Sequence, residues 1–233
     1  MRIAGIDPAW GHRNPDGLCL LEDRQLSRIA LLPGPETAAT VLDFAPDLIA
    51  VDAPVVVPNQ TGGRPVDRQV TSRFHAQKVA CYPGNRKNCA RILELVEPLT
   101  AAGFIESPDP KIPRPLIEVY PHLSILAFFQ LKERLLYKKG PVAAKRVVFG
   151  QLQELLRSYL DRHQFTCSPQ IEELLETPWS KKVEDQTDAI LCALTGHLHL
   201  GSGGEKTTHL GCDREGFLVY PLSPHDAPPS QTP

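Results

Sequence analysis

Short apolar runs that end at a proline or a turn alternate along this chain with longer segments in which apolar residues recur at helical spacing. Strands are predicted over residues 2–6, 18–21, 26–32, 47–52 and 116–121. Short polar turns separate the first three strands, which indicates a three-stranded meander. The last two are nearly unbroken apolar runs, typical of strands covered on both faces in a parallel sheet.

Helical spacing is found over residues 36–44, 67–79, 88–102, 142–162 and 182–200. A late hairpin is predicted over residues 207–220. A meander followed by alternating strands and helices is typical of an α/β domain. We therefore predict a mixed central sheet that is flanked by helices.

The composition places the chain among ordinary globular proteins. A hydrophobic content of 42% and a charged content of 22% exclude wholesale disorder. Its 233 residues are enough for one large domain. We predict a single domain over residues 1–222 with a helical insertion around 60–110, followed by a proline-rich flexible tail over 223–233.

The sequence predicts neither a secretion signal nor a membrane span. Asp7 interrupts any apolar signal segment near the N-terminus. The uncharged stretch 189–204 is short for a span and carries glycine, threonine and histidine. The cysteines lack Cys-x-x-Cys spacing, which argues against a structural zinc site. We expect a soluble, cytoplasmic protein with reduced cysteines.

Acidic residues fall at informative positions of this predicted fold. Asp7 ends the first strand, Asp52 ends the fourth, and Glu118 lies within the fifth. Sites of open α/β sheets form at the carboxyl ends of the strands, so these acids are predicted to converge. Asp185 and Asp188 lie three residues apart on the last long helix and are candidates to join them.

One face of that last helix combines acids with small residues. At about 100° per residue, Ala189, Cys192 and Gly196 lie on the side of Asp185, with Asp188 close by. A solvated face would continue with long charged side chains. The pattern instead predicts a helix that lies close to another backbone while it brings carboxylates to a shared point.

A cluster of carboxylates requires a cation, because like charges raise one another's pKa and oppose ionisation. Mg²⁺ and Mn²⁺ prefer oxygen ligands, and two such ions can stabilise both oxygens of a phosphodiester displacement. The acids therefore indicate metal-assisted phosphoryl chemistry. Other readings stay open for single residues: turns at Asp7 and Asp52, a salt bridge at Glu118, and first-turn helix acids at Asp185 and Asp188.

The formal charge of −2 hides a basic segment over residues 64–91, which carries seven Lys and Arg residues against one acid. The candidate phosphate-binding residues in this segment are Arg64, Arg68, Arg73 and Lys78. A second basic segment covers residues 132–146. Both segments also fit solvated helix faces neutralised by acidic neighbours. Nucleic acid is therefore a possible partner despite the average charge.

Five motifs follow one another along the chain: Gly5-Ile6-Asp7, Val51-Asp52-Ala53-Pro54, Gly63-Arg64-Pro65-Val66-Asp67, Glu118-Val119-Tyr120-Pro121 and Asp185-Gln186-Thr187-Asp188-Ala189. Together they resemble domain-of-unknown-function family 429, regarded as predicted nucleases related to the Holliday-junction resolvases. The resemblance implies a ribonuclease-H-like fold. It also implies that Asp7, Asp52 and Asp185 stand at metal-binding positions, with Glu118 and Asp188 as further catalytic candidates.

We therefore expect a nuclease that uses Mg²⁺ or Mn²⁺ to hydrolyse DNA or RNA. Related sequences often carry histidine where this chain has Glu184, which by helical angle points away from Asp185. This departure leaves room for an alternative, a non-catalytic nucleic-acid or protein-binding module on the same fold. Phosphoryl transfer on a nucleotide is a further alternative, although no glycine-rich adenosine-phosphate loop is present.

Overall fold

The computed structural model describes residues 1–223, so nearly all of the predicted tail at 223–233 lies outside the described residues. The main sheet has seven strands in the order β5-β6-β4-β1-β2-β3-β7. They are β1 (Arg2–Asp7), β2 (Asp16–Glu22), β3 (Gln25–Leu32), β4 (Leu48–Val51), β5 (Ile105–Glu106), β6 (Pro115–Glu118) and β7 (Thr166–Cys167).

The strand order confirms the predicted mixed sheet. β1, β2 and β3 form the antiparallel meander, whereas β4 pairs parallel to β1, and β6 pairs parallel to β4. In this register Ile6 is the partner of Val51, and Val51 is the partner of Glu118. The strand ends that carry Asp7, Asp52 and Glu118 therefore meet at one edge of the sheet.

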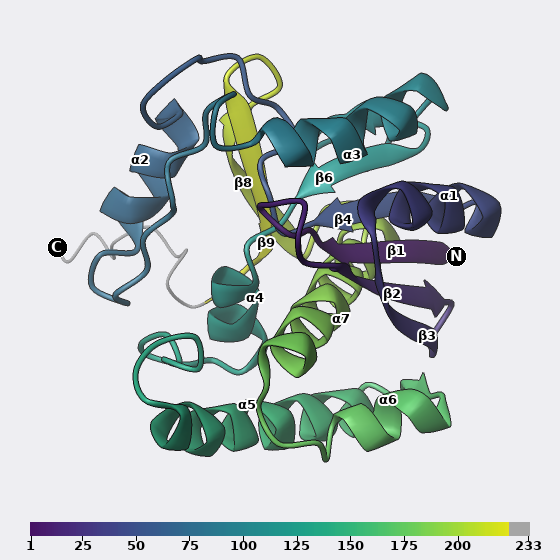
Figure 1. Cartoon of the computed structure of the whole chain (residues 1–233), viewed down its shortest axis with the longest axis vertical. Helices are drawn as coiled ribbons and strands as arrows, with labels where there is room; N and C mark the ends of the chain where they lie inside the picture. The colour runs from purple at the N-terminus through teal and green to yellow at the C-terminus, as the bar shows by residue number, and fades with distance from the viewer. Residues whose placement is uncertain (224–233) are drawn as a thin grey trace, which may run out of the picture.

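Helices cover both faces of this sheet. The helices of residues 1–223 are α1 (Gly34–Phe44), α2 (Pro65–Arg73), α3 (Ala90–Ala101), α4 (Pro121–Phe128), α5 (Val142–Arg162), α6 (Pro169–Leu174) and α7 (Lys181–Gly201). In Figure 1, α1 and α3 lie on one side of the sheet, and α7 crosses the other side with α5 and α6 beyond it. The α/β class is thereby confirmed.

Glycines allow α7 to approach the strands closely. A Cβ atom on Gly5 would lie 2.2 Å from the carbonyl oxygen of Ala189, and one on Gly17 would lie 2.4 Å from that of Asp185. A Cβ on Gly196 of the helix would likewise collide with Leu48. The predicted contact between the small-residue face of this helix and another backbone is confirmed.

The predicted hairpin is formed by β8 (Thr207–Cys212) and β9 (Gly216–Pro221). It packs against α2 and α4, and β9 also contacts β6. A second apolar cluster joins these elements: Val66, Val70, Phe74, Val79, Leu123, Leu126, Leu218 and Tyr220. The hairpin therefore holds α2, and the loops on either side of it, beside the acidic edge of the sheet.

Some elements differ from the predicted ones. α4 was not predicted, because residues 121–127 are all buried and so show no alternation of apolar and polar faces. α2 ends at Arg73 rather than at residue 79, since Phe74 leaves the helical region and Lys78 adopts a φ of 61°. β5, β7 and α6 are too short for their periodicity to stand out.

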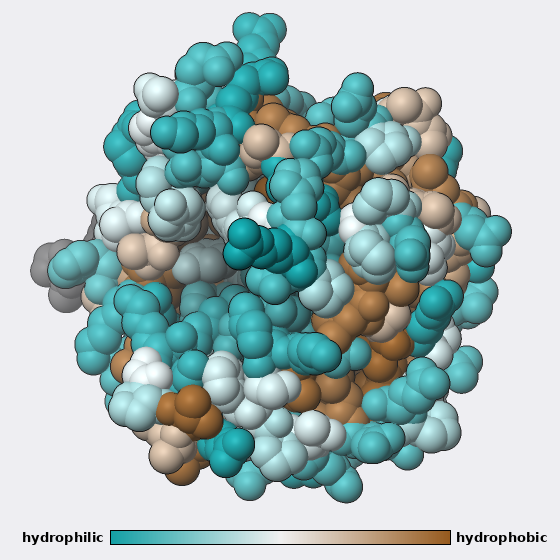
Figure 2. Space-filling model, in the orientation of Figure 1, coloured by the Kyte–Doolittle hydropathy of each residue, from teal (hydrophilic) through white to brown (hydrophobic). Residues whose placement is uncertain are grey.

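The surface view shows where polar and apolar residues gather. In Figure 2, hydrophilic residues surround the middle of the visible face, near the loop that follows β1, and apolar residues lie between α1 and α6. No helix within residues 1–223 is long and apolar enough to cross a membrane.

Candidate functional site

Three aspartates converge at the carboxyl edge of the sheet. Asp7, Asp52 and Asp188 each offer a carboxylate oxygen, and these oxygens lie within 4.8 Å of one another. Asp7 is the last residue of β1, and Asp52 follows β4, where its backbone N–H donates to the carbonyl of Ile6 at 2.8 Å. Asp188 comes from the opposite direction, on the helix that crosses these two strands.

The third member of the cluster is Asp188, whereas the expected metal set contained Asp185. Asp185 lies one helical turn earlier, where its backbone carbonyl abuts Gly17 and its carboxylate binds Lys181 Nζ at 2.6 Å. It lines the same cleft but does not belong to the three-carboxylate group. The structure therefore brings Asp7 and Asp52 of the expected set together with Asp188, whereas Asp185 lies one turn away and its expected metal role stays a prediction.

The cluster has unusual electrostatics because its carboxylates lie close together and are largely removed from water. Burial, reinforced by the charges of Asp52 and Asp188, raises the pKa of Asp7 well above its ordinary value. Burial likewise raises the pKa of Asp52 to about 8, although Lys138 opposes the shift. Asp188, which is fully buried, also has a raised pKa. Three carboxylates this close repel one another when ionised, and a cation placed among them would relieve that repulsion.

Lys138 provides positive charge at this cluster. Its Nζ atom lies 2.7 Å from Asp188 Oδ2 and 3.7 Å from Asp52 Oδ2. Burial alone would lower the pKa of Lys138, but the carboxylates, Asp188 foremost, raise it well above its ordinary value. The neighbouring Tyr137 hydroxyl donates to Asp188 Oδ1 at 2.7 Å and so fixes the orientation of that carboxylate.

Sequence reasoning did not single out Lys138 or Tyr137. Both lie in the loop between α4 and α5, where no periodic pattern distinguishes one residue from its neighbours. The only available signal was the basic character of residues 132–146, which does not identify the one lysine that reaches the acids.

Glu118 and Arg64 form a buried ion pair, which corrects the expected phosphate-binding role of Arg64. The guanidinium donates to both oxygens of Glu118 at 2.7 Å, and also to Asp67 Oδ1 and the carbonyl of Val56. Every N–H group of Arg64 is thereby used, and the side chain is 1% exposed. Burial alone would lower the pKa of Arg64, but the two carboxylates raise it.

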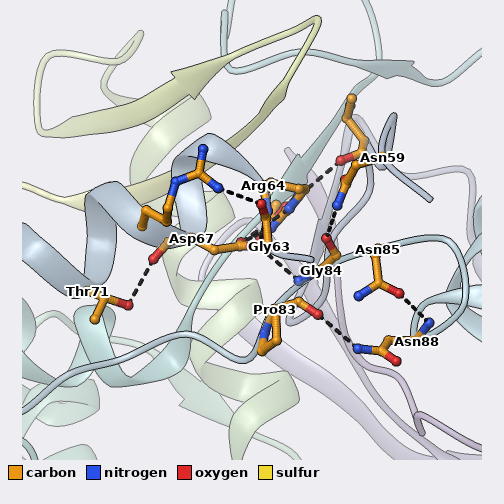
Figure 3. A network of polar contacts seen from close by, with 12 residues as sticks. Asn59, Gly63, Arg64, Asp67, Thr71, Pro83, Gly84, Asn85 and Asn88 are labelled. Atoms are coloured by element: carbon orange, nitrogen blue, oxygen red, sulfur yellow. Dashed lines mark hydrogen bonds and ion pairs between the residues drawn. The ribbon is translucent and has the colours of Figure 1, made fainter. Parts of the chain in front are cut away.

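The same network connects two loops at the edge of the cleft, as Figure 3 shows. Asp67 Oδ2 accepts hydrogen bonds from the backbone N–H groups of Arg64 and Gly84, at 2.8 and 2.9 Å. The Asn59 amide donates to the carbonyl of Gly84 at 2.9 Å. The loop before α2 is therefore fastened to the loop before α3, and Glu118 acts as an anchor for both.

The other predicted phosphate ligands lie farther from the acids. Arg68 is exposed, donates to the carbonyl of Gly63 at 2.8 Å, and lines a neighbouring hollow. Arg73 is exposed near the ring of Phe74, and Lys78 forms an ion pair with Glu133. Neither Arg73 nor Lys78 lines the cleft that contains Asp7. Of the four predicted residues, Arg68 is thus exposed in a hollow next to the cleft, and its expected phosphate-binding role stays a prediction.

Asp7 and Asp52 line a cleft with a volume of about 670 Å³, whereas Asp188 is fully buried. The cleft lining combines Asp7 and Asp52 with Lys138 and, at the rim, the aromatic residues Trp10 and Tyr82. A cleft of this size accommodates a group as large as a nucleotide.

Fold and site together define an α/β protein with a lysine-paired aspartate cluster at the carboxyl edge of its sheet. Residues 5–211 match the family described as protein of unknown function DUF429, and the chain belongs to this family. The resemblance drawn from the five motifs is thus confirmed at the level of the family. No curated protein matches the chain.

Proposed function

We propose that this protein is a metal-dependent nuclease. The observation that carries the proposal is the convergence of Asp7, Asp52 and Asp188 within 4.8 Å, with Asp7 and Asp52 lining a cleft. Three carboxylates this close repel one another, and Lys138 provides only one positive charge among them, so the cluster would be stabilised by a bound cation. Such an arrangement is typical of a functional site rather than of a stabilising one.

The topology supports a ribonuclease-H-like fold, which the family resemblance implies. An antiparallel meander is followed by parallel strands added on the far side of β1, and a late acidic helix crosses them. The acids come from β1, the end of β4 and α7, the elements on which the resemblance places metal-binding residues.

The donor set fits a hard divalent ion. Asp7, Asp52 and Asp188 supply only oxygen ligands, as Mg²⁺ and Mn²⁺ prefer. Asp188 Oδ2 is buried and lies 2.7 Å from Lys138 Nζ, so a divalent ion that binds this oxygen would take the place that the ammonium group holds in this structure. An ion held there would supply Lewis-acid stabilisation of the charge that develops on a phosphodiester.

The surrounding side chains have distinct tasks in this proposal. Tyr137 holds Asp188 in place through its hydrogen bond. Lys138, which is 28% exposed at its side chain, is positioned to bind a phosphate oxygen of the substrate. Asp185 lines the cleft beside the cluster, where it can orient a water molecule. Glu118 is bound to Arg64 and is therefore not assigned this role.

Cleavage assays on single-stranded, duplex and branched DNA and RNA, with Mg²⁺ or Mn²⁺ and with EDTA, test the proposal. We expect divalent-dependent cleavage that Asp7→Asn and Asp188→Asn reduce by about 100-fold or more, since each removes a charged ligand of an ion that contributes several kcal/mol to catalysis. Asp43→Asn, at an exposed position of α1, is the matched control and should retain full activity. Equal cleavage by Asp7→Asn and the unaltered chain would refute the assignment.

A second candidate is a non-catalytic binding module on the same fold. The ion pair between Lys138 and Asp188 favours it, because a lysine already neutralises part of the cluster. In that case isothermal titration with Mn²⁺ should give no binding heat that depends on Asp7. Nucleic-acid binding should then be the same with EDTA and with Mn²⁺, and no turnover should occur.

A further inference from the structure

Two aromatic side chains are exposed at the rim of the acidic cleft. Trp10 is 42% exposed and Tyr82 is 65% exposed. The other large hydrophobic residues exposed within residues 1–223 are aliphatic. Both line the cleft that contains Asp7 and Asp52. Their rings pack edge to face with centroids 5.4 Å apart. Large rings left in water at the edge of a site mark a surface that a ligand can cover.

The loops that carry these rings also carry exposed cations. Arg13 follows Trp10 between β1 and β2, and Arg86 and Lys87 follow Tyr82 before α3. All three are exposed, and none has an ion-pair partner within the described part of the chain. They are therefore available to a phosphate backbone, in contrast to Arg64 of the same basic segment.

Hydrogen bonds fix the position of the loop before α3 that carries Tyr82. Asp67 accepts from the N–H of Gly84, and Asn88 donates to the carbonyl of Pro83 at 3.1 Å. Figure 3 shows these bonds between the loop and the Arg64 network. A fastened loop presents Tyr82 at a fixed place relative to the acids, which lowers the entropic cost of stacking a ligand on it.

Aromatic faces with flanking cations are the features by which proteins bind single-stranded nucleic acid. The cations hold the backbone, and the rings stack bases. In a duplex the base faces are already stacked on one another and are not accessible to a side-chain ring. A free mononucleotide offers one base but no backbone to reach separated cations.

We propose that the Trp10–Tyr82 pair binds an unpaired base of a single-stranded nucleic acid, with one ring stacked on the face of the base and the other packed against its edge, while the backbone passes Arg13, Arg86 and Lys87. The inference rests on the proposed nuclease function and names its substrate class. The strand then enters the cleft with one phosphate directed toward Asp7, Asp52 and Lys138.

Fluorescence anisotropy with the full chain in EDTA tests the binding surface without any cleavage. The probes are a short labelled single strand, the same sequence as a duplex, and a mononucleotide. We expect the single strand to bind best, and Trp10→Ala and Tyr82→Ala each to weaken it by about 5-fold or more. Trp10→Phe retains a ring and should restore most of the affinity. Val147→Ala, at a 66% exposed apolar position of α5 outside the cleft, should change nothing.

A strand with an internal 2-aminopurine supplies a direct readout of stacking. Its fluorescence should be quenched by the unaltered chain and remain unquenched with Trp10→Ala. Tighter binding of the duplex, mononucleotide affinity equal to that of the strand, or unchanged binding by both alanine variants would overturn the inference.

Cleavage in Mn²⁺ separates this inference from the proposed function. If the protein cleaves nucleic acid but both alanine variants cleave every substrate like the unaltered chain, the stacking surface is refuted and the nuclease stands. If no substrate is cleaved but strand binding still depends on Trp10 and Tyr82, the nuclease is refuted and the binding surface stands.

Discussion

Arg64 binds Glu118 through two parallel hydrogen bonds of 2.7 Å, although the residues are 54 positions apart in the sequence. Arg64 precedes α2, and Glu118 ends β6, so the pair ties the loop beside the cleft to the edge of the sheet. Both side chains are almost fully buried, with exposures of 1% and 5%. Substitution of one partner in so deeply buried an ion pair is expected to destabilise the protein, because the other charge is then buried without a partner.

Arg64→Met should lower the free energy of unfolding by about 3–5 kcal/mol, because it leaves Glu118 and Asp67 as buried charges without their partner. Urea denaturation at neutral pH measures this change. Arg68→Met is the matched control, since Arg68 is exposed and donates only to the carbonyl of Gly63. Its effect should stay within about 0.5 kcal/mol. Equal stability of the two variants would show that the Arg64 network does not anchor the loops.

Gly5→Ala should destabilise the protein by about 1–3 kcal/mol or more, because its new Cβ would collide with the backbone of α7 at Ala189. If α7 moves to accommodate the methyl group, Asp188 moves away from Asp7, and divalent-ion affinity should fall as well. Gly150→Ala in α5 is the control, since no atom lies within 4 Å of its Cβ position. That change should stabilise the helix by about 0.5–1 kcal/mol. Thermal unfolding of both variants with and without Mn²⁺ provides the measurement.

The sequence was sufficient to predict where strands end and which of them carry acids. Pro8 and Pro54 end the strands shortly after Asp7 and Asp52. Parallel pairing of these two strands then places both aspartates at one edge of the sheet. Small residues on the last helix predicted its close approach, which Gly5 and Gly17 accommodate. These features are local in sequence, or they follow from rules of sheet topology.

The remaining features depend on tertiary contacts that no local pattern encodes. Asp185 and Asp188 lie on the same side of α7, and only the point where the helix crosses β1 and β2 decides which one joins the cluster. Arg64 looked like a surface cation because its partner Glu118 is distant in sequence. Lys138 reaches the acids from an irregular loop, for which periodicity gives no position.

Acidic pH should lower the free energy of unfolding through His199. This side chain is 3% exposed and hydrogen-bonded to Thr207 Oγ1 at 2.7 Å. Burial and the nearby His209 lower the pKa of His199 to about 4, partly opposed by Pro108 and Asp109. The unfolded chain therefore takes up a proton at this residue below about pH 6.5, while the folded chain does not.

The stability contributed by neutral His199 is thus present above pH 6.5 and is lost as the pH falls toward 4. We expect the unaltered chain to lose roughly 2–3 kcal/mol more than His199→Gln between pH 7 and pH 4. Urea denaturation at several pH values measures the difference between the two slopes. His75→Gln, at an exposed position, should keep the slope of the unaltered chain. A parallel slope for His199→Gln would contradict the assignment.

Lys138→Met should make the protein depend on a divalent ion for stability. Without metal, the change removes the cation that lies 2.7 Å from Asp188 and 3.7 Å from Asp52, so the carboxylates repel one another and Tm should fall. An ion that binds only the folded chain stabilises it by about 2.7 kcal/mol at a concentration of 100 times its Kd. Because the variant cluster is more negative, Mn²⁺ should bind it more tightly and raise its Tm more than that of the unaltered chain.

Thermal unfolding over a Mn²⁺ titration measures both effects of Lys138→Met. Lys139→Met is the matched control, because Lys139 is the exposed neighbour and has no carboxylate partner within the described residues. It should follow the unaltered chain at every Mn²⁺ concentration. Combining Lys138→Met with Asp7→Asn should remove the additional Mn²⁺ response, since a ligand is lost. The same Mn²⁺ response in Lys138→Met and in the double variant would mean that the ion binds elsewhere. The aspartates would then be neutralised by the lysine alone, as the non-catalytic alternative requires.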